Sequence, residues 1–518
     1  MKIQEVLGAS DETRLGMTSS SPFTGSPTFD QAPFSVDAGK RPPLGVYVWI
    51  EHDEDGVVHY GRINEGTEEN TRADPSRLQQ NQAYQVGVKE PRHGGDRAPH
   101  VVRVMMVEVL GQLRLETDGT LAIMEPEILP QTGRVVYEFP AERLPFLLGL
   151  PDDPEDGLDV GIFKSGLHSV ECIMPAESLI RHTAILGKTG VGKSYAVGVL
   201  IEEYARLGIP VFSADILGDL VNETEDLGGK NYRAGENFQV HYAIIGTTEF
   251  MAFNTNLTKE QSEIVSVAYA AVNHEAIQML NKTGRVDMPF QRLLEEIEVV
   301  GIRYGQAAVG TRAKQRVQAV LEHSRILAQT VGAWLAEMTS APIINVFVGH
   351  LSQRERNLIV AASARLLQTL RRRDRIPPFM FVLDEAHFFL PSGGETTPST
   401  GVIRELVRTA RHDAVGIVLI TQSPSSLDKQ ALLTCNTRVV FALDKDDVKV
   451  VSGTMGDLSE SAVARIPKMS KGTAIISSAM DIIRHPVVVR IRRRRTREGA
   501  PTPNMAKEVQ QWRQRKTN

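Results

Sequence analysis

The sequence of 518 residues has little cysteine and no long hydrophobic run, and each absence excludes a class of protein. Its two cysteines, Cys172 and Cys435, have neither the spacing of metal ligands nor that of a disulfide framework. No apolar segment approaches the roughly 20 residues of a membrane helix, and the N-terminus lacks the basic and then apolar pattern of a signal peptide. We therefore expect a cytoplasmic protein without membrane contact, in which both cysteines pack as small apolar side chains.

The sequence also lacks an excess of basic residues. Its 58 Lys and Arg against 63 Asp and Glu give a formal net charge of −5. A protein that is basic along its whole length is excluded, so any contact with nucleic acid must come from local basic patches or from an assembled pore. The length predicts roughly two to four domains.

The amino-acid composition of the first 170 residues changes at about residue 44. Residues 1–43 are rich in Ser, Pro, Gly, Thr and Asp, a composition that predicts a flexible arm. Residues 44–170 contain short β-branched and aromatic runs separated by turns, which predict a small barrel or sandwich. Because this segment holds no catalytic constellation, we interpret it as an assembly or docking module.

The α/β part of the chain contains a phosphate-binding motif. Residues 187–194 match the P-loop pattern G-x-x-x-x-G-K-[ST], with an apolar strand before them and a helical pattern after them. The glycines let backbone N–H groups point at a phosphate, Lys193 can reach the β- and γ-phosphates, and Ser194 can place its hydroxyl on Mg²⁺. The predicted nucleotide-binding residues are Gly187, Lys188, Thr189, Gly190, Val191, Gly192, Lys193 and Ser194.

Asp215 ends the next predicted strand, and Gly218 and Asp219 follow it. Carboxylates at the carboxyl ends of strands face the ligand crevice of an open α/β sheet, so we predict that Asp215 lies near the nucleotide. An ordinary turn aspartate is the alternative, because Asp is common in turns.

A continuous apolar run at residues 379–383 predicts a buried parallel strand, and Asp384-Glu385-Ala386-His387 follows it. We predict that Asp384 holds the Mg²⁺ shell and that Glu385 polarises the attacking water. His387 is open to either a packing or a functional role. Gln422 follows another buried strand, where its amide can contact the γ-phosphate or the attacking water.

Two further segments frame this core. Residues 258–340 are almost free of strand signals and predict a helical insertion, which divides the core into residues 171–257 and 341–491. Its basic side chains could touch DNA, although solvated helix faces are the simpler interpretation. Four arginines at 492–495 open a C-terminal tail, 492–518, and could bind DNA phosphates or a neighbouring subunit, or form a solvated charge run.

With these parts in order, the sequence resembles the HerA family of hexameric DNA-translocating ATPases, relatives of FtsK. The resemblance covers about residue 45 to the C-terminus and is carried by residues 182–194, 383–387 and 420–425 and by Asn436-Thr437-Arg438. It implies an α/β fold: a RecA-like P-loop core with an N-terminal HerA–ATP-synthase-type β-barrel, a helical-bundle insertion and a C-terminal brace.

The resemblance also implies that an arginine of one subunit completes the ATP site of the next. Arg411 is the first candidate and Arg408 the second, while Arg438 is a candidate for another interface contact. A positive donor beyond Lys193 is expected on chemical grounds, because negative charge develops on the γ-phosphate. The family's Asp-x-x-Gly-Glu-aromatic stretch is matched at Asp215 but not at Asp219, so Asp215 is the stronger candidate.

Two functions are open at this point. The first is a homohexameric ATPase that uses ATP and Mg²⁺ to translocate double-stranded DNA in DNA repair or antiviral defence. Its partner would be a NurA-like nuclease, a sirtuin-type NADase or another effector. The alternative is a ring scaffold that uses ATP mainly to assemble and regulate an effector enzyme. A coupling ATPase of conjugation or secretion is disfavoured by the missing membrane segment, and a two-lobed DEAH helicase by the single P-loop core.

Overall fold

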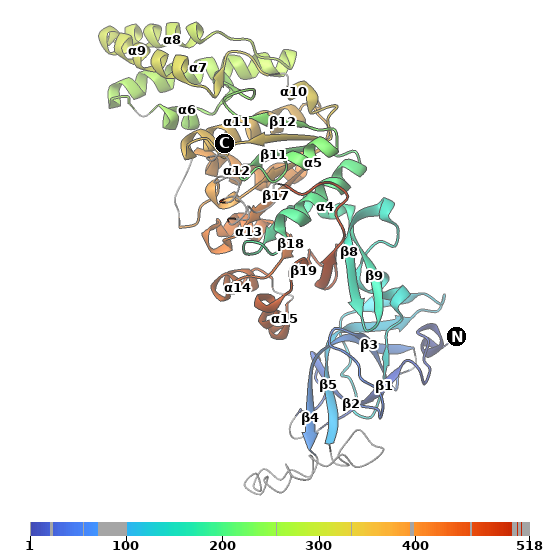
Figure 1. The fold of residues 1–518 in the computed structure, drawn as a ribbon. Coiled ribbons are helices and arrows are strands. Elements are labelled where there is room, and N and C mark those ends of the chain that lie inside the picture. The colour runs from blue at the N-terminus through green and yellow to red at the C-terminus, as the bar shows by residue number, and fades with distance from the viewer. Residues whose placement is uncertain are drawn as a thin grey trace, which may run out of the picture. The chain divides into compact units, whose positions relative to one another are not determined.

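The computed structural model divides the chain into two compact units, each described in turn (Figure 1). The first unit holds residues 1–152, 162–172 and 458–465, and the second holds the rest. The described residues are 2–20, 24–54, 56–70, 101–254, 256–332, 334–393, 398–455 and 458–499, with residues 505 and 509. The remainder of the C-terminal tail predicted at 492–518 lies outside the described residues. Within the described ranges, no helix combines the length and the apolar character that crossing a membrane requires.

The first unit contains a closed antiparallel β-barrel. Its strands follow the order β2-β1-β7-β3-β4-β5, and β2 pairs back onto β5 to close the ring, while β6 extends it from β5. The strands are β1 (Arg14–Thr18), β2 (Gln31–Val36), β3 (Tyr47–Glu51), β4 (Val57–Asn70), β5 (Val101–Leu115), β6 (Leu121–Met124) and β7 (Val135–Glu138). This unit also holds the short helices α1 (Ile3–Val6), α3 (Leu144–Leu148) and α15 (Glu460–Arg465).

The barrel corrects the prediction of a flexible arm at residues 1–43. Both β1 and β2 come from this segment, and Leu15, Phe34 and Val36 are buried in the barrel core. Gly16 is required where β1 meets β2, because a Cβ there would lie 2.1 Å from the Ser35 carbonyl oxygen. The segment looks disordered by composition because its few apolar side chains are separated by glycine, serine and proline, yet they fill the space that closes the barrel.

The second unit is built on one large, mostly parallel sheet. Its order is β12-β15-β11-β16-β17-β10-β18-β19-β20-β8-β9, parallel from β12 to β18 and antiparallel from β18 to β20. Two of its strands, β8 (Gly157–Ser165) and β9 (His168–Pro175), also hold residues 162–172 of the first unit. The others are β10 (Thr183–Leu186), β11 (Val211–Asp215), β12 (Lys230–Arg233), β15 (Ile343–Phe347), β16 (Phe379–Leu383), β17 (Val415–Thr421), β18 (Thr437–Val440), β19 (Thr473–Ser477) and β20 (Val487–Ile491). The central strands are fully buried apolar runs, as expected for a parallel sheet covered on both faces.

Helices connect the parallel strands and cover the sheet. They are α4 (Lys193–Arg206), α5 (Val221–Asp226), α11 (Gln353–Arg371), α12 (Pro398–Thr409), α13 (Lys429–Thr434) and α14 (Lys445–Ser452), with the 3₁₀ turns η4 (Ala176–Arg181), η6 (Ala386–Phe388), η7 (Ala410–Asp413), η8 (Pro424–Ser426) and η9 (Ile466–Lys468). Cys172 in the first unit and Cys435 in the second are buried free thiols, as the sequence predicted.

The helical insertion predicted at 258–340 appears as a bundle of antiparallel helices (Figure 1). Its long helix starts at a capping box in which Thr258 and Gln261 satisfy each other's backbone N–H groups. At the crossing of two other helices Gly301 and Gly310 lie in direct contact, because neither has a Cβ to separate the backbones. The elements are α6 (Thr247–Phe253), α7 (Lys259–Thr283), α8 (Phe290–Arg303), α9 (Ala307–His323) and α10 (Trp334–Glu337), with the small pair β13 (Val240–His241) and β14 (Leu327–Ala328).

The arginine run after β20 folds back onto its own unit as an extended strap. Arg492 donates to Glu202 at 2.8 Å and to Glu203 at 2.7 Å on α4, and Arg494 donates to Glu223 at 2.9 Å on α5. Arg492 and Arg494 point inward, while Arg493 and Arg495, which alternate with them, are exposed. For the two inward arginines, the expectation of a solvated run or of contacts to DNA is therefore wrong.

Candidate nucleotide-binding site

The P-loop lies between β10 and α4, at the carboxyl edge of the parallel sheet. Gly190 and Gly192 have φ of 79° and 112°, a backbone region that glycine enters without strain, and Gly192 is the N-cap of α4. At Gly187 a Cβ would lie 2.7 Å from the Cβ of Phe441, so only glycine fits. The loop therefore has the backbone that a phosphate cradle requires, at the N-terminus of a 14-residue helix.

Lys193 and Ser194 open α4 and turn back over this loop. Lys193 Nζ donates to the carbonyl of Lys188 at 3.2 Å, and the residue is 9% exposed. Burial lowers the pKa of Lys193, while the carboxylates of Glu385, Asp384 and Asp219 oppose that shift. The side chain is thus a cation held among carboxylates in a largely buried place, as a phosphate ligand would be.

Asp384 ends β16 beside the loop that follows β11. Its carboxylate accepts hydrogen bonds from the backbone N–H groups of Ile216 and Leu217, each at 3.3 Å. Burial, together with the neighbouring Asp215 and Glu385, raises the pKa of Asp384 to about 7. A cation in this place would relieve the repulsion between the carboxylates.

The contacts of Asp215 and Asp219 reverse the ranking that the sequence analysis gave these two residues. Asp215 is fully buried and accepts from the N–H groups of Gly218 at 2.7 Å and Leu220 at 3.2 Å, so it shapes the turn. Asp219, at the end of that turn, accepts from the Ser194 hydroxyl at 2.6 Å. The turn interpretation of Asp215 fits its contacts, whereas Asp219, which sequence reasoning ranked lower, contacts the serine of the P-loop. Its signal in the sequence was a place four residues after a strand-ending Asp and directly after Leu-Gly.

Glu385 is held in a strained backbone conformation next to Asp384. Its φ of 45° and ψ of 53° are left-handed, which costs a non-glycine residue of the order of 1–3 kcal/mol. The residue is 4% exposed, and its carboxylate accepts from the N–H of Gln422 at 3.4 Å. Strain of this kind clusters at functional sites, where the surrounding structure holds it.

Gln422 links the end of β17 to the phosphate-binding loop. Its side-chain oxygen accepts a hydrogen bond from the Thr189 hydroxyl at 2.5 Å. With the bond from its backbone to Glu385, Gln422 connects the P-loop to the carboxylate that follows β16. The structure thus brings together Lys193, Ser194, Asp384, Glu385 and Gln422, all of which the sequence predicted as one site.

The candidate arginines lie elsewhere. Arg411 is in η7, which comes before β17, whereas Gln422 comes after it, so the two stand at opposite edges of the sheet. A strand of seven residues spans about 23 Å. Arg408, 76% exposed, pairs with Glu405 at 2.7 Å on its own helix. Arg438 is buried on β18 beside the P-loop strand, which does not fit an interface contact.

His182 fixes this second edge of the sheet. Its Nε2 donates to the carbonyl of Val407 at 2.9 Å, while its Nδ1 accepts from the N–H of Ile417 at 3.3 Å. Burial lowers the pKa of His182 to about 4, so the ring is neutral and keeps both roles. The end of α12 and the turn that carries Arg411 are therefore anchored to the start of β10 and to β17.

The residues present fit a magnesium nucleotide. The glycine cradle suits phosphates, and the hydroxyl of Ser194 with the carboxylates of Asp384 and Asp219 gives the hard oxygen ligands that Mg²⁺ prefers. Among the described residues no group of His, Cys, Asp and Glu forms a ready-made metal centre. That agrees with an ion that takes part of its shell from phosphate oxygens and water.

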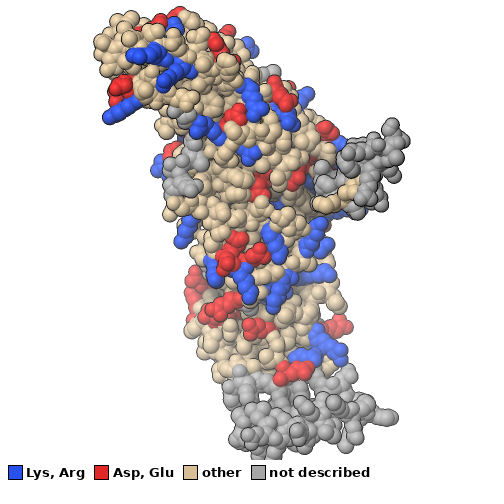
Figure 2. All heavy atoms as spheres, turned by 60° about the vertical axis from the view of Figure 1, so that its left-hand side comes forward, with Lys and Arg blue, Asp and Glu red and all other residues tan. Residues whose placement is uncertain are grey.

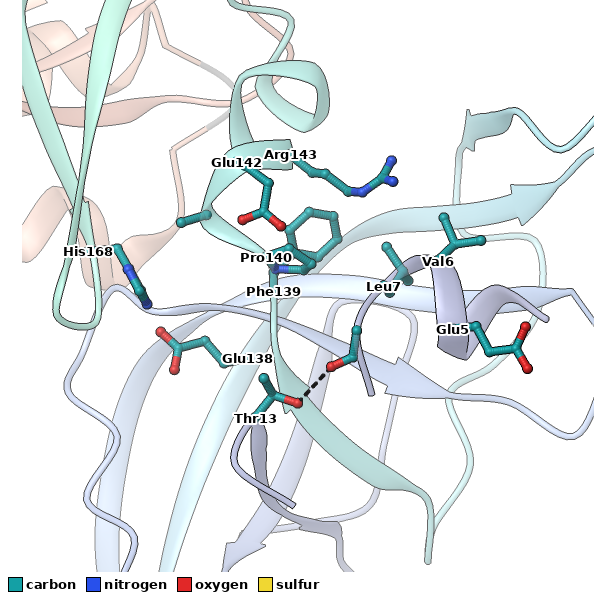
Figure 3. A pocket seen from close by; sticks show the side chains of 12 residues that line it. Glu5, Val6, Leu7, Thr13, Glu138, Phe139, Pro140, Glu142, Arg143 and His168 are labelled. Atoms are coloured by element: carbon teal, nitrogen blue, oxygen red, sulfur yellow. Dashed lines mark hydrogen bonds between the residues drawn. The ribbon is translucent and has the colours of Figure 1, made fainter. Parts of the chain in front are cut away.

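A separate pocket lies in the first unit (Figure 3). It has a volume of about 640 Å³ and is lined by α1, the end of β7 and the start of β9, and its lining includes Glu138 and His168. None of the predicted site residues lines this pocket.

Comparison with known proteins agrees with this geometry. The family model described as "Helicase HerA, central domain" matches residues 168–364. The "DNA double-strand break repair helicase HerA" of Sulfurisphaera tokodaii is 22% identical over 519 residues, covering 95% of this chain and 96% of that protein. The "Probable helicase MJ1565" of Methanocaldococcus jannaschii is 24% identical over 92% of this chain and 90% of its own length.

A solved structure supports the fold. VirB4 of Thermoanaerobacter pseudethanolicus superposes with a TM-score of 0.51 at 15% identity, covering 65% of this chain and 96% of that one. The predicted architecture, a P-loop core with an N-terminal β-barrel, is confirmed. The resemblance that the sequence motifs indicated is confirmed as well.

Proposed function

We propose that this chain, a HerA-type P-loop ATPase, assembles as a homohexameric ring that hydrolyses ATP to translocate double-stranded DNA. The observation that carries the proposal is the separation of two parts of one active site. The phosphate loop and its carboxylates lie at one edge of the sheet, while the exposed Arg411 lies at the other. A subunit of this construction needs a neighbour to complete its site.

Within one subunit each side chain has a role that its position supports. Lys193 binds the β- and γ-phosphates, and Glu385 accepts the proton of the attacking water. Ser194 and Asp384 hold Mg²⁺, with Asp219 next to the same hydroxyl. When bound, the ion neutralises phosphate charge. Gln422 contacts both Thr189 and Glu385, so its position depends on what the P-loop holds.

The trans arginine follows from electrostatics. Hydrolysis builds negative charge around the γ-phosphate, and an arginine finger that meets this charge accelerates phosphoryl transfer by roughly 10³ to 10⁵. Arg411 is exposed and makes no side-chain hydrogen bond or ion pair with any residue that the structure describes. We assign it to the site of the adjacent subunit, with Arg408 as the second candidate because Glu405 already engages it.

The ring also accounts for DNA binding by an acidic chain. On the face in Figure 2, Lys and Arg are interspersed with Asp and Glu over the described residues, without one continuous basic patch. Six copies of a few basic side chains around an axis would form a positive channel that a single subunit lacks. The proposed substrate places the motor in the cytoplasm, beside a nuclease or another effector in DNA-end repair or antiviral defence.

Mixing two inactive variants tests the shared site. Lys193→Ala subunits keep Arg411, and Arg411→Ala subunits keep Lys193, so a mixed ring contains some sites in which both groups are intact. We expect each variant alone to be inactive and an equimolar mixture to regain part of the ATPase activity. The double variant Lys193→Ala/Arg411→Ala, mixed with wild type in the same ratio, is the control. A mixture as inactive as its components would contradict a shared site.

Duplex DNA separates the motor from the ring scaffold. A motor should hydrolyse ATP faster when duplex DNA is present, and Glu385→Gln should bind ATP yet lose both hydrolysis and biological activity. A scaffold would keep activating its effector when Glu385→Gln has stopped hydrolysis. That outcome would overturn translocation as the function.

A further inference from the structure

We propose that His387 is a positioning residue for Glu385. In this arrangement Glu385 is the general base, the His387 imidazole orients its carboxylate, and the Thr421 hydroxyl fixes the imidazole. This inference rests on the proposed function, because it assigns a part in the hydrolysis that Glu385 is proposed to perform. No catalytic role for His387 follows from its place in the sequence alone.

The contacts of the imidazole carry the inference. His387 Nδ1 lies 3.3 Å from Glu385 Oε2 and 3.0 Å from Thr421 Oγ1. The Thr421 hydroxyl in turn accepts from the N–H of Ser423 at 3.1 Å. A single proton on Nδ1 keeps a bare lone pair from facing the carboxylate, and its hydrogen bond is made with Thr421. The hydroxyl therefore fixes the ring with Nδ1 next to the Glu385 carboxylate.

Glu385 needs such a partner more than an ordinary glutamate does. Its backbone is left-handed and its side chain is 6% exposed, so solvent does not orient the carboxylate. The other donor to it, the N–H of Gln422, is long at 3.4 Å. A carboxylate with few donors in a buried place can turn away from the water it must polarise, and a general base is efficient only within hydrogen-bond reach of the proton it takes.

The imidazole is itself held in place from the far side. Its ring packs against the Phe388 ring at a centroid distance of 4.3 Å, and the Phe388 carbonyl accepts from Gln353 Nε2 of α11 at 2.7 Å. Thr421, at the end of β17, is fully buried. The orienting group thus stands between a helix and a sheet strand, which is the arrangement that keeps a catalytic side chain in one rotamer.

Steady-state kinetics of His387 variants in the full-length chain, with ATP and duplex DNA, test the role. We expect His387→Ala to lower kcat by roughly 10-fold to 100-fold, a part of the roughly 10² to 10⁴ that a general base contributes. KM and the affinity for a fluorescent ATP analogue should stay unchanged. His387→Asn can place its amide nitrogen where Nδ1 stands, so it should recover most of kcat. His387→Gln reaches too far and should not.

Two double variants exclude a merely structural role. Thr421→Val removes the hydroxyl at constant shape and should lower kcat less than His387→Ala, and the two changes together should cost no more than His387→Ala alone. In a Glu385→Gln background, His387→Ala should have no further effect on hydrolysis. Melting temperatures within the scatter of wild type confirm that the variants fold.

The outcomes separate this inference from the proposed function. A wild-type chain that does not hydrolyse ATP, even with duplex DNA, would overturn the proposed function and the positioning role with it. A wild-type chain that does, together with a His387→Ala variant of unchanged kcat, would overturn the positioning role alone. A loss that appears only in KM, or equal losses for Asn and Gln, would do the same.

Discussion

Arg492 and Arg494 of the strap carry the same charge as Arg408 and Arg411 but lie in opposite surroundings. Arg492 and Arg494 are enclosed by the glutamates of α4 and α5, and the side chain of Arg494 is only 3% exposed. Arg408 and Arg411 project from the end of α12 and the turn after it. Carboxylates neutralise the two buried guanidiniums, so the strap stabilises its own unit, while the exposed Arg411 is available for the proposed contact with another subunit.

The largest effect that this comparison predicts is on catalysis. Arg411→Ala should lower the kcat of ATP hydrolysis by roughly 10³ to 10⁵, the acceleration that an arginine finger supplies. It should leave the free energy of unfolding within about 0.5 kcal/mol, because the side chain is exposed. Arg408→Ala is the matched control and should cost far less activity. Equal losses for both variants would contradict the choice of Arg411.

The next largest effect is on stability, where the buried arginine matters and the exposed one does not. Arg494→Met removes the partner of the buried Glu223 and should lower the free energy of unfolding by roughly 3–5 kcal/mol. Arg495→Met is the control, since its side chain is 63% exposed and should cost less than about 1 kcal/mol. Denaturant titration measures both. If Arg494→Met lowered the free energy of unfolding no more than Arg495→Met does, the strap would not stabilise the subunit in the way that its contacts indicate.

The pH dependence of the unfolding free energy tests the same contrast between buried and exposed charges. Burial raises the pKa of Glu223 from its ordinary value of 4.5 to about 7, against the opposing pull of Arg494. The folded chain therefore holds this proton more tightly than the unfolded chain. The resulting stability is complete below about pH 4.5 and is lost as the pH rises to about 7, a change of at most about 3 kcal/mol.

Comparison with Glu223→Gln isolates this contribution from the other titrating groups. The difference in unfolding free energy between wild type and variant should fall across that pH window. Parallel profiles would mean that Glu223 has the same pKa in the folded and the unfolded chain, with the ion pair to Arg494 offsetting burial.

The smallest effect concerns one glycine of the P-loop helix. A Cβ on Gly198 would lie 2.5 Å from the guanidinium carbon of Arg494. Replacing a helical glycine by alanine ordinarily stabilises by about 0.5–1 kcal/mol. Here Gly198→Ala should instead destabilise by about 1–2 kcal/mol, because Arg494 must move away from Glu223. Combined with Arg494→Met, the alanine should become neutral or favourable. Stabilisation by Gly198→Ala alone would show that the strap is not tightly seated.

The composition of each segment decided how well it could be predicted. Residues 379–387 are a continuous apolar run followed by two carboxylates, and this local pattern predicted both β16 and the site at its end. Residues 1–43 have no such pattern, and the two strands hidden there were missed because, apart from each other, their partners β7 and β5 are distant in sequence. Pairing of β2 with β5, some 75 residues away, cannot be read from six residues with one proline.

The candidate site likewise contains residues that the sequence predicted and residues that it did not. Lys193, Ser194, Asp384 and Glu385 were predicted because each follows a strand at a fixed offset in its motif. Asp219 and His387 were not, because their importance depends on side-chain distances: 2.6 Å to the Ser194 hydroxyl and 3.3 Å to Glu385. No spacing rule encodes those contacts, since they join residues of different loops or lie within an irregular turn.

The sequence by itself determined three features. These are the order along the chain of the strands that carry motifs, the phosphate-binding loop, and the pair of carboxylates opposite that loop. Local backbone requirements and hydrophobic runs specify these without reference to the rest of the chain. Only the tertiary structure decided which charges are internal and which are available to a neighbour. Burial and pairing depend on what surrounds a side chain, so the arginines at 494 and 411 differ only once the chain has folded.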